Sequence, residues 1–262
     1  MENLLTDSLL FDQFSDIQYF FTTRKGGFSD GNYTSFNLSP FVGEKPQHVA
    51  QNLNKLAEIL SLPTDKIFFP HQNHGKLIYE IDETFLQFPP EDQKNRLVNR
   101  DGLFTNLKNI CVSVTTADCV PLLFYDPVKK AVAAAHAGWR GTVQQIAAKM
   151  VITLVRKYGC SPKNIRVVMG PAISKQKYEV GKEILLTFKI AGFETSEIFS
   201  QRENKIFLNL WKANEMILLR SGVLKSNIEI KELCTFTNSS DFFSARRDGT
   251  PCGRMLSGII LR

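Results

Sequence analysis

Residues 110–141 read ICVSVTTADCVPLLFYDPVKKAVAAAHAGWRG and contain three apolar runs close together. The runs at 110–114, 120–125 and 131–135 are short and partly β-branched, which is typical of buried strands. The third run consists of small apolar residues, which suit a crowded position in the middle of a sheet. The sequence therefore predicts three consecutive strands separated by tight turns.

The breaks between these runs carry the reactive side chains. Residues 115–118 interrupt the first run, so Cys119 is expected on a turn at a strand end. The third run is expected to deliver His136 to a loop that contains glycines. Thr142 is then predicted to cap one helix that continues to about Tyr158, with Gly159 as its stop.

The rest of the chain supplies further strands and helices without strict alternation. This order favours an α+β fold, with one domain over residues 1–262 and helices packed on a mixed sheet. The polar segment 83–96 is interpreted as a surface insertion or lid with no assigned chemistry. Strands are predicted at 17–23, 65–69, 77–81, 165–169, 227–233 and 255–261, and helices at 46–60, from 181 to about 190 and from 210 to about 220.

Composition restricts the class of protein. A chain of 262 residues with 43% hydrophobic residues can bury a large core. The net charge of +6 is spread along the chain without a basic run or nucleic-acid motif, so no nucleic-acid partner is expected. No apolar run approaches the roughly 20 residues that span a bilayer, so no membrane association is expected. Five cysteines without a paired spacing favour a reducing cytoplasm over a secreted disulfide framework.

A thiol and imidazoles on neighbouring loops admit three interpretations. Cys119 and His136, with a histidine from the segment His71-Gln72-Asn73-His74-Gly75, could bind zinc. Cys119 and His136 could instead form a nucleophile and its base. Cys119 could also be an inert buried thiol, which is common among cysteines. The residues alone leave these alternatives open.

The chain resembles the YfiH/YlmD-like family, whose members have carried the name polyphenol oxidase or laccase and are now described as purine nucleoside phosphorylases. The segments TTADCVPLLFYDP and AAAHAGWRGT carry the most specific part of the resemblance. It extends in order over nearly the whole chain, through FTTRKGGFSDGNYTSFNLS, HQNHG, RDGLFTN, GPAISKQKYEVG and CTFTNSSDFFSARRDG.

The resemblance implies a YfiH-like, cysteine-hydrolase-like fold and one catalytic zinc on His74, Cys119 and His136. It favours His74 over His71, because Gln72-Asn73-His74-Gly75 matches the family motif. His71 and His48 are interpreted as ordinary residues. A laccase is disfavoured, since several copper sites need many imidazoles and the chain has four histidines.

The implied activities are phosphorolysis of adenosine, inosine, guanosine and S-methyl-5′-thioadenosine, and deamination of adenosine. Phosphate is the implied co-substrate, and the chain is expected to be a monomer or a homodimer. Asp118 is a candidate general acid or base, or an orienting partner of a histidine. Arg140 is expected to hold phosphate, because its guanidinium forms a fixed fork of donors. The weaker candidates for substrate binding are Arg24, Asn37, Arg246 and Arg247.

Two other classes of function remain open at this level. One is a metal-free cysteine hydrolase or deamidase that uses Cys119 and His136. The other is a catalytically silent protein that binds a metal or a partner.

Overall fold

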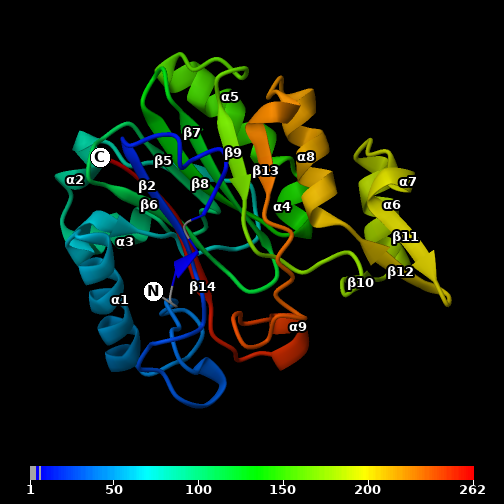
Figure 1. Ribbon diagram of the computed structural model, residues 1–262, viewed down its shortest axis with the longest axis horizontal. Helices are drawn as coiled ribbons and strands as arrows, with labels where there is room; N and C mark the ends of the chain where they lie inside the picture. Colours follow the sequence, from blue (N-terminus) through cyan, green and yellow to red (C-terminus); the bar gives the residue numbers. More distant parts are fainter. Residues whose placement is uncertain (1–3, 6) are drawn as a thin grey trace.

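The last strand of the chain lies in the middle of a sheet. The computed structural model describes residues 4–5 and 7–262 (Figure 1). Strand β14 pairs antiparallel with both β2 and β6, whereas β3 is parallel to β6. This five-stranded sheet has the order β1 (Leu4–Leu5), β2 (Ile17–Thr22), β14 (Met255–Leu261), β6 (Cys111–Thr116) and β3 (Ile67–Phe68).

A six-stranded sheet carries the other two strands of the central segment. Strand β7 pairs antiparallel with β8 on one side and with β9 on the other, and parallel pairs close both edges. The order is β13 (Ile228–Ile230), β9 (Arg166–Met169), β7 (Val120–Asp126), β8 (Ala131–Ala137), β5 (Gly102–Thr105) and β4 (Ile78–Glu80).

The remaining elements are helices and one small antiparallel sheet, which projects at the right of Figure 1. That sheet has the order β10 (Glu179–Val180), β12 (Lys205–Leu208) and β11 (Phe199–Arg202). The α-helices are α1 (Pro46–Leu60), α2 (Glu83–Leu86), α3 (Pro90–Arg96), α4 (Trp139–Val143), α5 (Ile146–Tyr158), α6 (Lys182–Ile190), α7 (Thr195–Ile198), α8 (Leu210–Arg220) and α9 (Ala245–Asp248). Short 3-10 helices span Gly31–Tyr33, Thr64–Lys66 and Lys225–Asn227.

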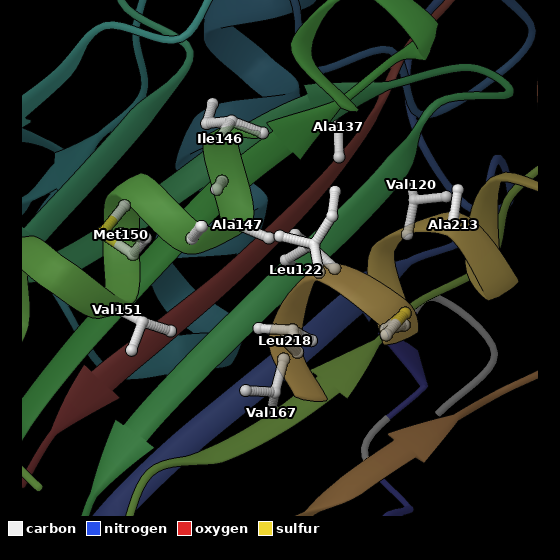
Figure 2. Packing of buried hydrophobic residues seen from close by; sticks show 14 of the residues in the cluster. Val120, Leu122, Ala137, Ile146, Ala147, Met150, Val151, Val167, Ala213 and Leu218 are labelled. Atoms are coloured by element: carbon white, nitrogen blue, oxygen red, sulfur yellow. The ribbon is translucent and has the colours of Figure 1, made fainter. Parts of the chain in front are cut away.

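Strand alternation accounts for three of the four apolar clusters in the described interior. The odd-numbered alanines of β8 face a core formed with α5 and α8, and Figure 2 shows part of this packing. Val132 and Ala134 face the opposite way, toward Val112 and Val114 of β6 in the other sheet. On the outer face of the five-stranded sheet, Ile260 packs with residues of α1. Successive residues of a strand face opposite sides of the sheet, so each strand contributes side chains to two different cores.

The α+β class with mixed sheets is confirmed, and the structure adds a second large sheet to the one expected. The reason is that every residue of β7 and β8 is buried, which requires cover on both faces of the six-stranded sheet. Within the described residues, no helix combines the length and the apolar character needed to cross a membrane.

Three local expectations need correction. His136 lies within β8 and not on a loop, because the ladder with β7 continues to Ala137. The helix predicted after Thr142 is broken into α4 and α5, with Gln145 in the left-handed region at φ 60. Thr142 lies inside α4, and its hydroxyl accepts from Asn214 Nδ2 at 3.0 Å in place of capping a helix.

The segment 83–96 is anchored by its own helices. Asp82 caps α2, since its side chain accepts a hydrogen bond from Phe85 N at 2.7 Å. Phe85 is buried and meets Phe68 edge to face, with ring centroids 5.3 Å apart. An aromatic residue fixed in the core between the sheets makes this segment part of the fold, which is more than the surface insertion that was expected.

Candidate metal centre

The three predicted metal ligands meet at one end of the space between the two large sheets. His136 is near the end of β8, Cys119 is in the turn between β6 and β7, and His74 is in the loop after β3. Their ligand atoms all lie within 4.8 Å of one another. The rings of His74 and His136 are nearly perpendicular, with centroids 4.8 Å apart.

One buried carboxylate orients both histidines. Asp101 Oδ1 lies 2.8 Å from His136 Nδ1 and also accepts from His74 N at 3.0 Å. Its Oδ2 accepts from Gly75 N at 2.8 Å and Asn73 N at 3.3 Å. The imidazole of His136 therefore donates through Nδ1 and presents Nε2 to the centre, which is how metal-binding histidines are usually held.

Sequence reasoning missed Asp101, although it lies in the quoted segment RDGLFTN. The feature that could have indicated Asp101 is its position directly before β5, because β5 pairs with β8, the strand that carries His136. His136 N donates to Asp101 O at 2.7 Å, so both the main chain and the side chain of Asp101 bond to His136.

Mutual electrostatic effects favour the charged form of each central group. Burial opposes ionisation of Cys119, but His136 and His74 outweigh it and lower the pKa of the thiol. Burial disfavours the imidazolium of His136, but Cys119 and Asp101 raise its pKa. The pKa of Asp101 is lowered, because His136 and the backbone amides outweigh burial. A ready thiolate is the form of cysteine that binds metals.

The loop of His74 is fixed to the five-stranded sheet by a side-chain amide. Gln72 Oε1 accepts from Thr115 N at 2.7 Å, and Gln72 Nε2 donates to Thr115 O at 2.9 Å. Gln72 thus pairs with β6 as a neighbouring strand would. On the other side, a Cβ at Gly138 would lie 2.9 Å from Cys119 Sγ, so only glycine fits between the thiol and His74.

The donor set fits zinc. Zn–S bonds of about 2.3 Å and Zn–N bonds of about 2.0–2.1 Å place the ligand atoms of a tetrahedral site roughly 3.3–3.6 Å apart. Ligand atoms within 4.8 Å of one another need only small side-chain rotations to reach that geometry. One thiolate and two imidazoles would leave a fourth position open, as catalytic zinc sites do.

Asp118 points away from this cluster, into the C-terminal loop. It has a φ of +97 in the turn before Cys119. Its Oδ1 accepts from Thr235 Oγ1 at 2.6 Å, and its Oδ2 accepts from Arg246 N at 2.7 Å. Both carboxylate oxygens are therefore used to fix the loop that contains α9.

Two of the candidate arginines act electrostatically on Tyr178, whose pKa also responds to Cys119. Arg140 is exposed and lies over the Trp139 ring, 4.4 Å from its centroid. The Arg246 guanidinium lies 5.1 Å from the centroid of Tyr178 and donates to Glu179 O at 2.7 Å. Burial and the nearby Cys119 raise the pKa of Tyr178. This neutral phenol, half-buried beside two cations, was missed by sequence reasoning.

The other substrate-binding candidates are engaged in hydrogen bonds with the protein itself. The guanidinium of Arg247 donates to the carbonyls of Thr235, Phe236 and Phe242. Arg24 donates to the carbonyls of Thr34 and Ser239. Asn37 is fully buried, and its amide bonds Ser39, Glu44 and Arg254 N. A substrate would have to displace these contacts, and the binding role of the three residues stays a prediction.

The two remaining histidines lie outside the cluster. His71 stacks on Phe41 with ring centroids 4.2 Å apart, and His48 Nδ1 lies 3.1 Å from Glu44 Oε1. The stacked His71 faces the same cavity as His74, but its ring is held by the aromatic partner. This arrangement is consistent with the choice of His74 as the ligand.

A cavity of about 190 Å³ opens beside the three ligands. Its walls come from both large sheets and from the loop before α1, and they include one arginine that the sequence reasoning did not single out. The lining residues are Ser39, Phe41, Val42, His71, Gln72, His74, Thr115, Thr116, Ala117, Cys119, His136, Ala245 and Arg254.

Comparisons of the sequence with known proteins agree over most of the chain. The model of the family described as multi-copper polyphenol oxidoreductase laccase matches residues 18–262. A purine nucleoside phosphorylase from Bacteroides thetaiotaomicron is 37% identical over 250 residues, covering 95% of this chain and 93% of that protein. Adenosine deaminase RL5, from an unknown prokaryotic organism, is 36% identical over 247 residues, covering 93% of each.

Solved structures show the same fold. The crystal structure of the Bacillus licheniformis protein YfiH has a TM-score of 0.91 at 33% sequence identity, and covers 100% of this chain and 97% of its own. The crystal structure of YlmD from Geobacillus stearothermophilus has a TM-score of 0.90 at 31% identity, and covers 99% of this chain and 96% of its own.

Proposed function

The chain belongs to the multi-copper polyphenol oxidoreductase laccase family, which includes YfiH and YlmD, and we propose that it is a zinc-dependent purine nucleoside phosphorylase that also deaminates adenosine. The observation that carries this proposal is the cluster of His74, Cys119 and His136 in a chain 37% identical to a purine nucleoside phosphorylase. The proposed nucleosides are adenosine, inosine, guanosine and S-methyl-5′-thioadenosine. The proposed products of phosphorolysis are the free base and ribose 1-phosphate or its methylthio form.

The histidine inventory argues against a multi-copper oxidase despite the family description. Copper sites of such enzymes draw on many imidazoles, and this chain has four histidines. His48 is bonded to Glu44, and His71 stacks on Phe41. The remaining two imidazoles, His74 and His136, and the thiol of Cys119 support a single site for one zinc ion per chain.

Asp101 and the main chain hold the candidate metal ligands close to the arrangement that a metal would need. Zinc held by His74, Cys119 and His136 would supply Lewis acidity at an open coordination position. Asp101 keeps the proton of His136 on Nδ1, so Nε2 stays available as the ligand atom. Asp101 also holds the backbone of His74 and Gly75, which fixes the main chain that carries the second imidazole. Preorganised groups of this kind need no rearrangement during the reaction.

The two proposed reactions differ in the nucleophile. In phosphorolysis a phosphate oxygen bonds to C1′ of the ribose, and the bond from C1′ to the purine nitrogen breaks. That nitrogen keeps the electron pair and takes up the proton that phosphate carried. In deamination the oxygen of water adds to C6 of adenosine, and ammonia leaves. Arg140 and Arg246 are proposed substrate contacts, because Arg246 lies over the Tyr178 ring and both cations, with Cys119, act electrostatically on that tyrosine.

Product analysis with inosine and adenosine tests the proposal. Inosine should release hypoxanthine and ribose 1-phosphate only when phosphate is present. Adenosine deamination should depend less on phosphate, because it consumes water. Equal inosine cleavage in phosphate-free buffer, with ribose as the product, would replace the phosphorylase by a hydrolase. No product from any of these nucleosides, with zinc bound, would favour a binding protein.

A metal-free cysteine hydrolase is the second candidate, and one observation favours it. Cys119 and His136 stabilise each other as thiolate and imidazolium, which is also the state of a cysteine nucleophile beside its base. Metal analysis of protein purified without added zinc separates the two candidates. About one zinc per chain supports the zinc enzyme, and full activity in metal-free protein supports the hydrolase.

From the sequence we also propose a cytoplasmic location and a monomeric or homodimeric state. The five cysteines are free thiols in the structure. Gel filtration with light scattering would measure the oligomeric state directly.

A further inference from the structure

The cavity beside the ligand cluster is shared by the two large sheets. His136 and Cys119 approach it from the six-stranded sheet, whereas Thr116 and Arg254 approach it from the five-stranded sheet. Thr116 is the last residue of β6, and it is paired with Met255, the residue after Arg254. One wall therefore offers metal ligands, and the facing wall offers a hydroxyl and a guanidinium.

The cavity favours an anion. Among the residues that the structure describes, its lining includes no aspartate or glutamate, and its one permanently charged side chain is the guanidinium of Arg254. Within the described chain, no carboxylate lies within ion-pair distance of Arg254, in contrast to Arg247 beside Asp248. A half-buried cation without a counter-ion attracts an anion more strongly than a solvated surface cation does.

One edge of the Arg254 guanidinium is anchored, which leaves the other edge available. Nη1 donates to Cys252 O at 2.8 Å and Gly253 O at 3.0 Å, and it also contacts Cys252 Sγ at 3.0 Å. In the described part of the protein, Nε and Nη2 have no hydrogen-bond partner. The main chain of Arg254 is fixed as well, since its N–H donates to Asn37 Oδ1 at 2.9 Å. A guanidinium held this way presents two donors in the fork that suits phosphate.

Two hydroxyls of the same cavity can add donors. The side chain of Ser39 accepts from Phe41 N at 3.3 Å, and its own proton is left for another acceptor. The Thr116 hydroxyl has no hydrogen-bond partner among the residues with described positions. Both residues are almost fully buried, at 2% and 1% exposure, so a polar ligand is the natural partner for these groups.

We propose that Arg254, Ser39 and Thr116 form the subsite that binds inorganic phosphate as the second substrate of nucleoside cleavage. This inference rests on the proposed function and gives its co-substrate a location next to the zinc ligands. The subsite holds the phosphate whose oxygen bonds to C1′ of the ribose as the bond from C1′ to the purine nitrogen breaks. It competes with the expectation that Arg140 holds phosphate, since Arg140 is exposed and does not line this cavity.

The experiment compares the zinc-loaded wild type with Arg254→Gln, Arg254→Lys and Arg140→Gln. Arg202→Gln is the control, because Arg202 donates to a backbone carbonyl as Arg254 does, but lies in the small sheet and does not line the cavity. Two quantities are measured: the Kd for inorganic phosphate alone by calorimetry, and the KM values for phosphate and for inosine. Zinc content and Tm are recorded for every variant.

Arg254→Gln should raise the phosphate Kd and KM by roughly 10- to 100-fold, with the inosine KM within about threefold of wild type. The phosphate Kd and KM of Arg254→Lys should lie between those of the wild type and Arg254→Gln, because lysine keeps the positive charge but not the forked pair of donors. If Arg254→Gln fails to fold, Thr116→Val tests the same subsite and should raise the phosphate KM by roughly 3- to 10-fold.

The outcomes separate the subsite from the enzyme class. Unchanged phosphate Kd and KM in Arg254→Gln, or a rise in Arg140→Gln alone, would overturn the subsite and leave the phosphorylase intact. Loss of phosphate binding in Arg254→Gln, in a protein that cleaves no nucleoside, would support the anion subsite and overturn the proposed function. Loss of phosphate binding in Arg202→Gln as well would show a general charge effect and overturn the subsite.

Discussion

Asp101 and Asp118 are both buried carboxylates close to Cys119, yet they organise different regions. Asp101 binds the ring of His136 and the backbone of His74, so it holds the ligand region together. Asp118 binds Thr235 and the backbone of Arg246, so it holds the C-terminal loop region. The residue adjacent to the ligand in sequence serves the loop, and the residue 18 positions before Cys119 serves the ligands. Proximity along the chain is therefore a poor guide to which carboxylate orients a metal ligand.

The largest effect is expected at the thiol itself. Cys119→Ala should remove most of the bound zinc and the nucleoside cleavage together, because the remaining two imidazoles make an incomplete site. Metal analysis of the purified protein measures this. Cys234→Ala is the control, since that thiol is buried away from the cluster and bonded by Ser174 N. Full zinc occupancy in Cys119→Ala would show that Cys119 is not a metal ligand, and the ligand region would then have to be defined by other residues.

Asp101→Ala should produce the next largest effect. It leaves His136 Nδ1 and the amides of His74 and Gly75 without their acceptor, and each unsatisfied buried group costs about 1–3 kcal/mol. Loss of such an orienting partner typically weakens metal binding by about 10- to 100-fold. Competition with a zinc chelator measures the affinity. Asp101→Asn keeps one acceptor oxygen and should lie between the alanine variant and the wild type.

Asp118→Asn should change stability more than zinc binding. The asparagine keeps an acceptor for Thr235 but places an amide donor against the N–H of Arg246, at a cost of about 1–3 kcal/mol. For a chain of this size, roughly 2–4 °C of Tm is lost per kcal/mol. The zinc affinity should stay within about threefold of wild type. A fall in zinc affinity comparable with that of Asp101→Ala would show that Asp118 also supports the metal ligands and not only the C-terminal loop.

The smallest effect is expected at His71. His71→Ala removes a stack with Phe41 at the cavity mouth, so zinc content should be unchanged and the Tm should fall slightly. His74→Ala, three residues later, should lose the metal. Parallel metal analyses of the two variants test this. Zinc retained in His74→Ala and lost in His71→Ala would show that the loop presents the other imidazole.

The strongly patterned parts of the chain could be predicted from the sequence. Helix α1 was predicted with its bounds, because Pro46 suits a first turn and the apolar residues recur at helical spacing. Strand β14 was predicted with its bounds for a similar reason, as a continuous apolar run. The expected stop at Gly159 is confirmed by its φ of +67, which places it in the left-handed region.

The misses come from contacts between residues far apart in sequence. No local pattern shows that β8 continues through His136, because that extension depends on the ladder with β7. The small sheet of β10, β11 and β12 was missed because its strands are short and partly exposed. The three candidate metal ligands were predicted from motif and resemblance, whereas Asp101 and Arg254 reach the site through strand pairing that brings distant segments together.

The central position of β14 also sets an order of events during biosynthesis. The ribosome makes His74, Cys119 and His136 long before Met255, the first residue of the strand that completes the five-stranded sheet between β2 and β6. At 5–20 residues per second, the 119 positions from His136 to Met255 take roughly 6–24 s to translate. During that interval β2 and β6 are without the strand that lies between them in the finished sheet. Because β2 and β6 are not paired with each other, the five-stranded sheet can form only after Met255–Leu261 has been made.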